Sequence, residues 1–275
     1  MFGPFYGSRA PTLFIFITVL ISASLKTVSQ SLAAAVLLGL LFASPAQAQR
    51  KGRTTSTANA DGSLPTAAGT AAQPARLQPL FGGLTPAQAT QLIGETQLKA
   101  ITASFASAAE ASAFFTTKGY EYLGENQPDT AAYRFNLAWL LDPKNAEAYR
   151  GLGIVASNRA ASDAAIELLA KGYALAPGSA LLMGDLGASY LIRYGKTKKK
   201  KDLSAGMELL QRATATEPAN AVAWQQLARG LYYQEKYAEA WTAVHKGQSM
   251  NVSSLDFDLI SDLKDKLADP KGIFK

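Results

Sequence analysis

The stretch that decides the fold spans residues 112 to 145 and reads SAFFTTKGYEYLGENQPDTAAYRFNLAWLLDPKN. Its closing motif, LDPKN, returns as LAPGS at 175–179 and as TEPAN at 216–220. Pro143, Pro177 and Pro218 are therefore separated by 34 and then by 41 residues. A fixed period of this size indicates stacked supersecondary units, each of which buries its apolar face only against its neighbours. We expect the second half of the chain to build a surface from repeats.

Small and large residues recur at fixed places within each unit. When each unit is numbered so that its proline stands at position 32, small residues at positions 8, 20 and 27 let two helix backbones approach. Large residues at positions 4, 7, 11 and 24 fill the remaining space. In this numbering, the first unit begins at Ser112 and contains Phe115, Gly119, Tyr122, Ala131, Phe135, Ala138 and Pro143.

This pattern resembles the tetratricopeptide repeat family, and in the first unit only Lys118 at position 7 departs from it. Three further units follow in register and begin at Ala146, Ala180 and Ala221. Their matching residues are Tyr149, Leu152, Gly153, Ala165, Leu169, Gly172 and Pro177, then Met183, Leu186, Gly187, Tyr190, Gly206, Leu210, Ala213 and Pro218, then Trp224, Leu227, Ala228, Leu231, Ala240, Val244 and Gly247. The resemblance implies an all-α, right-handed superhelical solenoid of antiparallel helix pairs.

The register predicts repeats at 112–145, 146–179, 180–220 and 221–254, preceded by a helical lead-in at 85–111. Asn145, Ser179 and Asn220 lie two residues after each proline, where their side chains can cap the next helix. Residues 255–275 are expected to form a capping helix and a tail, with Ser253 or Ser254 at the start of that helix.

The first 48 residues have the pattern of a signal peptide. An apolar run from Leu32 to Ala43 is shorter than a membrane span, and Ala46 and Ala48 suit a signal peptidase, which predicts cleavage after Ala48. Residues 49–84 are rich in Ala, Thr, Ser, Gly and Pro, without an apolar period, and predict a disordered linker.

The leader is longer than usual, because a second apolar run extends from Leu13 to Ile21. Translation that begins at Leu25 would give a leader of conventional size. Alternatively, both runs form an uncleaved anchor in the inner membrane. Both interpretations predict an exported protein of the periplasm or cell envelope.

Composition excludes several kinds of site. The chain contains no cysteine and a single histidine, His245, which leaves little for a metal site or a catalytic triad, and we expect His245 to be a partly exposed helix residue. No catalytic residues and no cofactor are predicted. After residue 48 the formal charge is +4, from 25 basic and 21 acidic residues, which argues against a dedicated nucleic-acid binder.

The resemblance also implies a binding groove, because the first helices of such repeats line a concave surface at positions 2, 5, 9 and 12. A groove of this kind suits a peptide or a helix of a partner protein. The corresponding residues are Thr116, Tyr120, Glu147, Arg150, Ile154, Leu181, Leu191, Gln225, Arg229 and Tyr232. Some of them could instead pack against the lead-in or simply face solvent.

The interval of 41 residues contains an insertion of seven residues, and the sequence there is GKTKKKK at 195–201. Lys196, Lys198, Lys199, Lys200 and Lys201 form a basic loop between the two helices of the third unit. It could contact an anionic surface such as membrane headgroups or an acidic polymer, or it could be a solvated loop tip. The sequence therefore predicts a non-enzymatic protein-interaction scaffold, with binding of an anionic surface as the alternative.

Overall fold

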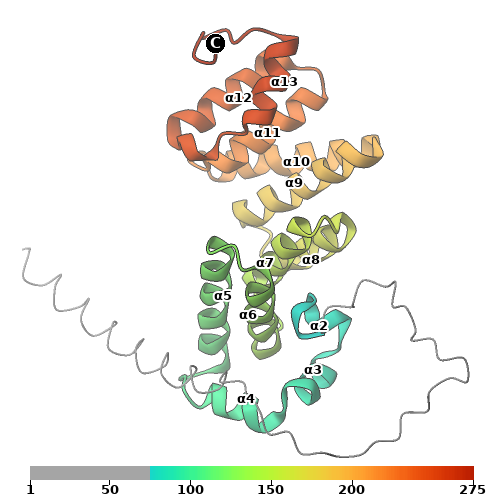
Figure 1. Ribbon diagram of the computed structural model, residues 1–275, viewed down its shortest axis with the longest axis vertical. Helices are drawn as coiled ribbons and strands as arrows, with labels where there is room; N and C mark the ends of the chain where they lie inside the picture. Colours follow the sequence, from blue (N-terminus) through green and yellow to red (C-terminus); the bar gives the residue numbers. More distant parts are fainter. Residues whose placement is uncertain (1–74) are drawn as a thin grey trace, which may run out of the picture. The chain divides into compact units, whose positions relative to one another are not determined.

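The chain divides into two units, 1–68 and 69–275, and the computed structural model describes residues 75–275 of the second (Figure 1). The expected signal peptide, the alternative start and most of the expected linker lie outside the described residues. Within residues 75–275 all regular secondary structure is helical. None of the helices described there is both long enough and apolar enough to cross a membrane.

Four antiparallel helix pairs form the body of the unit. The pairs are α5 (Ala108–Gly124) with α6 (Pro128–Leu141), α7 (Ala146–Asn158) with α8 (Ser162–Leu175), α9 (Ala180–Thr197) with α10 (Lys200–Thr216), and α11 (Ala221–Tyr233) with α12 (Tyr237–Met250). Each first helix also contacts the first helix of the next pair, whereas each second helix mainly contacts the first helix that follows it. The pairs therefore stack in sequence order, as predicted (Figure 1).

The predicted caps form at the start of three first helices. Asn145 Oδ1 accepts hydrogen bonds from the backbone N–H groups of Glu147 and Ala148, at 3.0 and 3.2 Å. Ser179 Oγ accepts from the N–H of Leu182, and Asn220 Oδ1 accepts from that of Ala223. Each proline motif thus ends one helix and starts the next within a few residues.

Small residues bring the two helices of a pair into backbone contact. A Cβ built on Gly153 would lie 2.5 Å from Leu169 Cγ. In the third pair, a Cβ on Gly187 would lie 2.8 Å from Leu210 Cγ and 3.0 Å from the carbonyl oxygen of Gly206. Only glycine permits so close an approach, and this is the physical basis of the small residues at positions 8 and 20.

Helical structure begins earlier than the sequence predicted. The 3₁₀ helix η1 (Ala75–Leu77) and the short α2 (Leu80–Gly83) precede α3 (Pro86–Ile93) and α4 (Glu95–Thr102). Phe81 is fully buried, and Asn136 Nδ2 donates to the carbonyl oxygens of Arg76 and Gln78. The expectation that the linker extends to residue 84 is therefore wrong for residues 75–84, because α6 binds this segment.

The helix α13 (Phe257–Lys266) covers the last pair with Leu259, Ile260 and Leu263, which are all buried. Its cap is Asp256, whose Oδ1 accepts from the N–H of Leu259, rather than Ser253 or Ser254; those serines lie in the 3₁₀ helix η2 (Val252–Ser254). The α13 helix contacts α12, although less extensively than a first helix contacts the preceding second helix, and it covers the end of the last pair.

The tail after α13 folds back onto α12. Asp269 accepts backbone hydrogen bonds from Lys271, Ile273 and Phe274, and its Oδ1 lies 2.9 Å from Nε2 of His245. The rings of Trp241, His245 and Phe274 lie within 6.0 Å of one another and are nearly parallel. His245 is 5% exposed, so the expectation of a partly exposed histidine is wrong: a tail distant in sequence covers it.

Candidate functional site

A charged network crosses the layer of first helices at α5, α7 and α9. Arg150 on α7 donates from Nε to Asp185 Oδ2 on α9 at 2.6 Å and from Nη1 to Glu147 Oε2 at 3.2 Å. Tyr120 on α5 donates its hydroxyl to Glu147 Oε2 at 2.8 Å, and the Arg150 guanidinium lies over the tyrosine ring. Three of these four residues, all but Asp185, were predicted for the groove.

Burial and charge act against each other in this network. Burial raises the pKa of the Asp185 carboxyl above its ordinary value, and Arg150 offsets part of that rise. Burial also raises the pKa of the Tyr120 hydroxyl, which therefore remains a donor. The pKa of Arg150 is raised: burial opposes the charge, but Asp185 and Glu147 outweigh it. One arginine thus holds two carboxylates, and the cluster carries a net negative charge at neutral pH.

Three predicted groove residues are buried instead. Thr116 donates to the Ser112 carbonyl and accepts from Asn145 Nδ2, so it supports the cap of the next helix. Leu191 is 2% exposed and lies in the core between the last two pairs. Gln225, also 2% exposed, donates to the Val244 carbonyl of its own pair. These residues face the helix partners and cannot line a groove.

On the first helices of the last two pairs, the exposed stripe of side chains is shifted from the predicted one. Two of its four positions lie one residue later, at 6 and 13 instead of 5 and 12. On α9, the exposed or half-buried residues include Leu181, Asp185, Ala188 and Ile192, and on α11 they include Val222, Gln226, Arg229 and Tyr233. Their positions are 2, 6, 9 and 13; position 5 is buried in both helices, and position 12 is buried at Leu191 but half-buried at Tyr232. Leu181 is 42% exposed, and Ile154 on α7 is half-buried.

The capping segment occupies the C-terminal half of the stripe on α11. Arg229 donates to Asp256 Oδ2 and to Asp262 Oδ2, so the capping helix already binds this predicted groove residue. Tyr232 is half-buried, and its ring lies 6.0 Å from that of Tyr233 and 5.8 Å from that of Tyr237. Arg229 and Tyr232 therefore serve the closed end of the stack.

The insertion lengthens two helices instead of forming a loop. The α9 and α10 helices contain 18 and 17 residues, compared with 13 and 14 in the pairs on either side. Lys198 alone takes the left-handed conformation, with φ at 55°, and turns the chain between them. Of the predicted basic loop, Lys196 therefore lies on α9, Lys200 and Lys201 lie on α10, and all five lysines are exposed.

A buried ion pair holds the extended hairpin together. Arg193 on α9 donates to both carboxylate oxygens of Asp202 on α10, at 3.0 and 2.8 Å, and to Asp163 at the start of α8, at 2.7 Å. Asp202 is 1% exposed. The hydrogen bonds from Arg193 hold the pKa of the Asp202 carboxyl below its ordinary value. This pair was absent from the sequence prediction.

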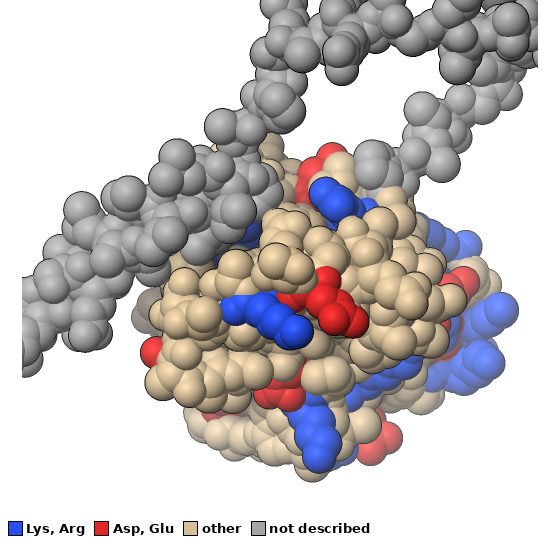
Figure 2. Space-filling model, turned by 90° about the horizontal axis from the view of Figure 1, so that it is seen from below, with Lys and Arg blue, Asp and Glu red and all other residues tan. Residues whose placement is uncertain are grey.

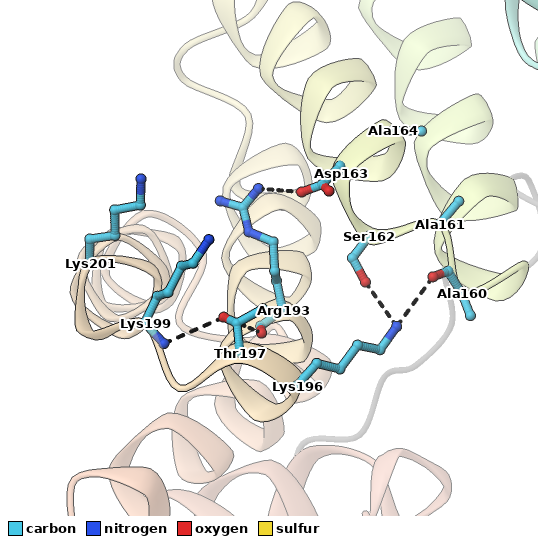
Figure 3. A pocket seen from close by; sticks show the side chains of 10 residues that line it. All are labelled: Ala160, Ala161, Ser162, Asp163, Ala164, Arg193, Lys196, Thr197, Lys199 and Lys201. Atoms are coloured by element: carbon cyan, nitrogen blue, oxygen red, sulfur yellow. Dashed lines mark hydrogen bonds and ion pairs between the residues drawn. The ribbon is translucent and has the colours of Figure 1, made fainter.

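A hollow of about 440 Å³ lies between the α7–α8 turn and the hairpin (Figure 3). Ala160, Ser162 and Asp163 line one side, and Arg193 and Lys199 line the other. Lys196 Nζ crosses it and donates to the Ala160 carbonyl at 3.2 Å and to Ser162 Oγ at 3.1 Å. The hollow therefore has basic and acidic walls that are already partly paired with each other.

Comparison with solved structures supports the family resemblance at the level of the fold. TTC0263, a thermophilic TPR protein of Thermus thermophilus, aligns with a TM-score of 0.50 at 16% identity over 56% of this chain and 80% of that one. The described part has the tetratricopeptide repeat fold.

Two other TPR structures are similar to a lesser degree. MamA of Desulfovibrio magneticus RS-1 aligns at 17% identity over 58% of this chain and 86% of that one, with a TM-score of 0.44. YrrB, described as a TPR protein with an unusual peptide-binding site, aligns at 17% identity over 67% and 84%, with a TM-score of 0.43. No family model matches the sequence, and no curated protein does.

The tetratricopeptide frame explains why sequence reasoning missed Asp185 and Asp202. Both are acids on the third helix pair, and their partners lie 35 and 9 residues away in sequence. Position 6 of the repeat is not among the four positions that the resemblance assigned to the groove, so Asp185 carried no signal. Asp202 directly follows the lysine run, and an acid at that place could have been recognised as a partner for a nearby arginine.

Within residues 75–275 no group of three or more histidine or acidic side chains is arranged to hold a metal ion.

Proposed function

We propose that the chain is a non-enzymatic protein-interaction scaffold whose layer of first helices binds a peptide or a helix of a partner protein. One row of side chains carries this proposal. Glu147, Leu181 and Val222 occupy position 2 of three successive first helices; Leu181 and Val222 are 42 and 54% exposed, and Glu147 is half-buried. They therefore form a continuous line across α7, α9 and α11.

The packing indicates on which side of the stack this row lies. Successive first helices touch one another, whereas second helices mainly reach the first helix of the next pair. The layer whose members are closer together lies on the inner side of a curved stack. This supports placing the row on the concave side, which is the side that can surround an extended segment.

The row combines two kinds of chemistry. Leu181 and Val222 offer apolar area on neighbouring helices, and such area favours a partner with aliphatic or aromatic side chains. Glu147 belongs to the Arg150 network, whose excess negative charge favours a partner with a basic side chain beside the apolar ones. The favoured partner is thus an amphipathic segment of mixed apolar and basic character.

Site-specific photocrosslinking tests this proposal in cells that produce the full chain. A photoreactive amino acid replaces Leu181 or Val222, and Leu175 provides the matched control, because it is 44% exposed on the second helix α8. We expect the same crosslinked partner at 181 and 222 and none at 175. Equal crosslinking at 175, or no product at either groove position, would contradict the proposal.

The proposed place of action is the periplasm or the cell envelope. This proposal rests on the apolar run from Leu32 to Ala43 and on the small residues Ala46 and Ala48, which lie outside the described residues. Sequencing of the mature N-terminus tests it. An N-terminus at Gln49 would support export with cleavage, and an intact leader in a cytosolic fraction would exclude it.

A further inference from the structure

The basic charge of the described part is concentrated at one end of one hairpin. Residues 75–275 contain 22 basic and 20 acidic side chains, and five of the basic ones lie between Lys196 and Lys201. Without these five lysines the remaining balance is 17 basic against 20 acidic. We call residues 196–201 the lysine tip. It is a positive pole on a unit that is otherwise slightly negative.

The tip is held rigidly. Arg193 ties α9 to α10 through the buried Asp202, and Lys196 ties the hairpin to the α7–α8 turn. The ammonium group of Lys198 lies over the rings of Tyr194 and Tyr233, at 5.5 and 5.6 Å from their centroids. The tip therefore presents its remaining charges without a large cost in chain entropy on binding.

Three of the lysines form no ion pair among the described residues, although Lys199 and Lys201 act at longer range on the Asp202 carboxyl and lower its pKa. Lys199, Lys200 and Lys201 are exposed, and the neighbouring acid, Asp202, is occupied by Arg193. Figure 3 shows the side chains of Lys199 and Lys201 at the start of α10, with no hydrogen bond or ion pair from their ammonium groups to the other residues drawn. Lysine in the first turn of a helix also opposes the helix dipole, so helix stability does not explain this run.

The tip projects beyond the neighbouring pairs. Each of its helices is longer by three to five residues than its counterparts, and Tyr233, the last residue of α11, already lies beside Gly195. Figure 1 shows the hairpin reaching past the adjacent helices on one side, and Figure 2 shows basic side chains gathered at that same margin. The end of the hairpin is a convex point, but three of its lysines, Lys196, Lys199 and Lys201, also line the hollow beside it.

We propose that the lysine tip docks the protein on a membrane surface that contains anionic phospholipids. A convex point can touch a flat surface, whereas recognition of an acidic protein requires complementary shape. Lysine acts as a flexible point charge, and the arginine nearby has no free fork of donors for bidentate recognition, because Asp202 and Asp163 occupy it. Clusters of lysines near a bilayer are attracted by anionic headgroups in this non-specific way.

Vesicle binding of the compact unit 69–275 tests the proposal. This unit contains every contact described above and is capped at its C-terminal end by α13, and circular dichroism with thermal melting verifies the fold of each variant. We expect the unit to sediment at low salt with phosphatidylcholine vesicles that contain about one third phosphatidylglycerol and not with pure phosphatidylcholine. The binding should weaken steeply as salt is added.

The decisive variant is the triple change K199Q, K200Q and K201Q. We expect its vesicle affinity to fall on the order of 100-fold at low salt, because each lysine near the surface contributes several-fold. The matched control, K99Q with K144Q and K266Q, removes the same charge from exposed lysines elsewhere and should bind nearly as the parent does.

Three results would overturn the proposal. The first is failure of the parent unit to bind the anionic vesicles at low salt, and the second is a loss of affinity in the control as strong as in the tip variant. Tighter binding to soluble polyglutamate or polyphosphate than to the vesicles would assign the tip to an acidic polymer instead. None of these outcomes bears on the crosslinking at Leu181 and Val222, so the two proposals can fail separately.

Discussion

The second and third helix pairs have the same helix–turn–helix arrangement but differ in how the turn between their two helices is held in place. Both pass through a single left-handed residue, Ala160 with φ at 60° and Lys198 with φ at 55°. In the second pair Arg159 reaches backwards, to Asp129 and to the Leu77 carbonyl of the preceding elements. In the third pair Arg193 binds Asp202 of its own hairpin. The crosslink of the third pair thus flanks the inserted stretch 195–201 and joins the two longer helices to each other.

The largest expected effect comes from breaking that crosslink. R193M leaves the buried carboxylate of Asp202 unpaired and should lower the free energy of unfolding by about 3 kcal/mol. R150M in the second pair should cost less, about 2 kcal/mol, because the Asp185 side chain is 27% exposed and its raised pKa eases protonation once Arg150 is removed. Urea denaturation of both variants measures the difference. Equal losses would mean that the hairpin crosslink has no special role.

A smaller effect should follow from filling the close contact in the third pair. G187V forces a side chain against Leu210 and the Gly206 carbonyl and should cost about 2 kcal/mol. The control is G184A on the same helix, where an added Cβ meets nothing within 4 Å and helix propensity predicts a gain of about 0.5 kcal/mol. Thermal melting separates the two. Destabilisation by G184A would show that flexibility rather than contact governs α9.

The smallest expected effect is an opposite pH dependence at the two arginine partners. The pKa of Asp202 is lowered in the folded state, so its contribution is present above about pH 4 and is lost as the pH falls through the lowered value. The pKa of Asp185 is raised by burial, so its charged form costs stability, and that cost disappears as the pH falls through the raised value.

Acid titration of unfolding in the two variants checks the signs. On acidification the advantage of the parent over D202N should shrink by about 1 kcal/mol, and the parent should improve relative to D185N. If both variants followed the same trend, hydrogen bonding would not control the pKa of Asp202 while burial controls that of Asp185.

The helix pairs were predictable because their signals are local. A proline, a capping residue two positions later and small residues at fixed spacing each act within one turn or one pair, as at Asn145 and Gly187. The groove was predictable in part. Tyr120, Glu147 and Arg150 do meet, whereas Leu191 and Gln225 turn into the core, because the stripe shifts by one position in the later pairs.

The remaining features depend on contacts between distant residues. Asn136 binds the backbone of Arg76 and Gln78, which precede it by 60 and 58 residues. Asp269 of the tail, which contacts His245, follows it by 24 residues. No periodicity marks such contacts, because each involves a single polar group and a segment that has no repeat of its own. The acidic partners of Arg193 and Arg229 belong to the same class.

The covered end of the stack has a consequence for assembly. Repeat proteins can in principle add copies end to end, since each pair offers its face to another pair, and a head-to-tail contact of this kind does not close on itself. Here α13 and the ring of Phe274 already occupy the face of the last pair. The face of the last pair is therefore not open to another copy, and an end-to-end contact here would have to use the outer side of α13 instead.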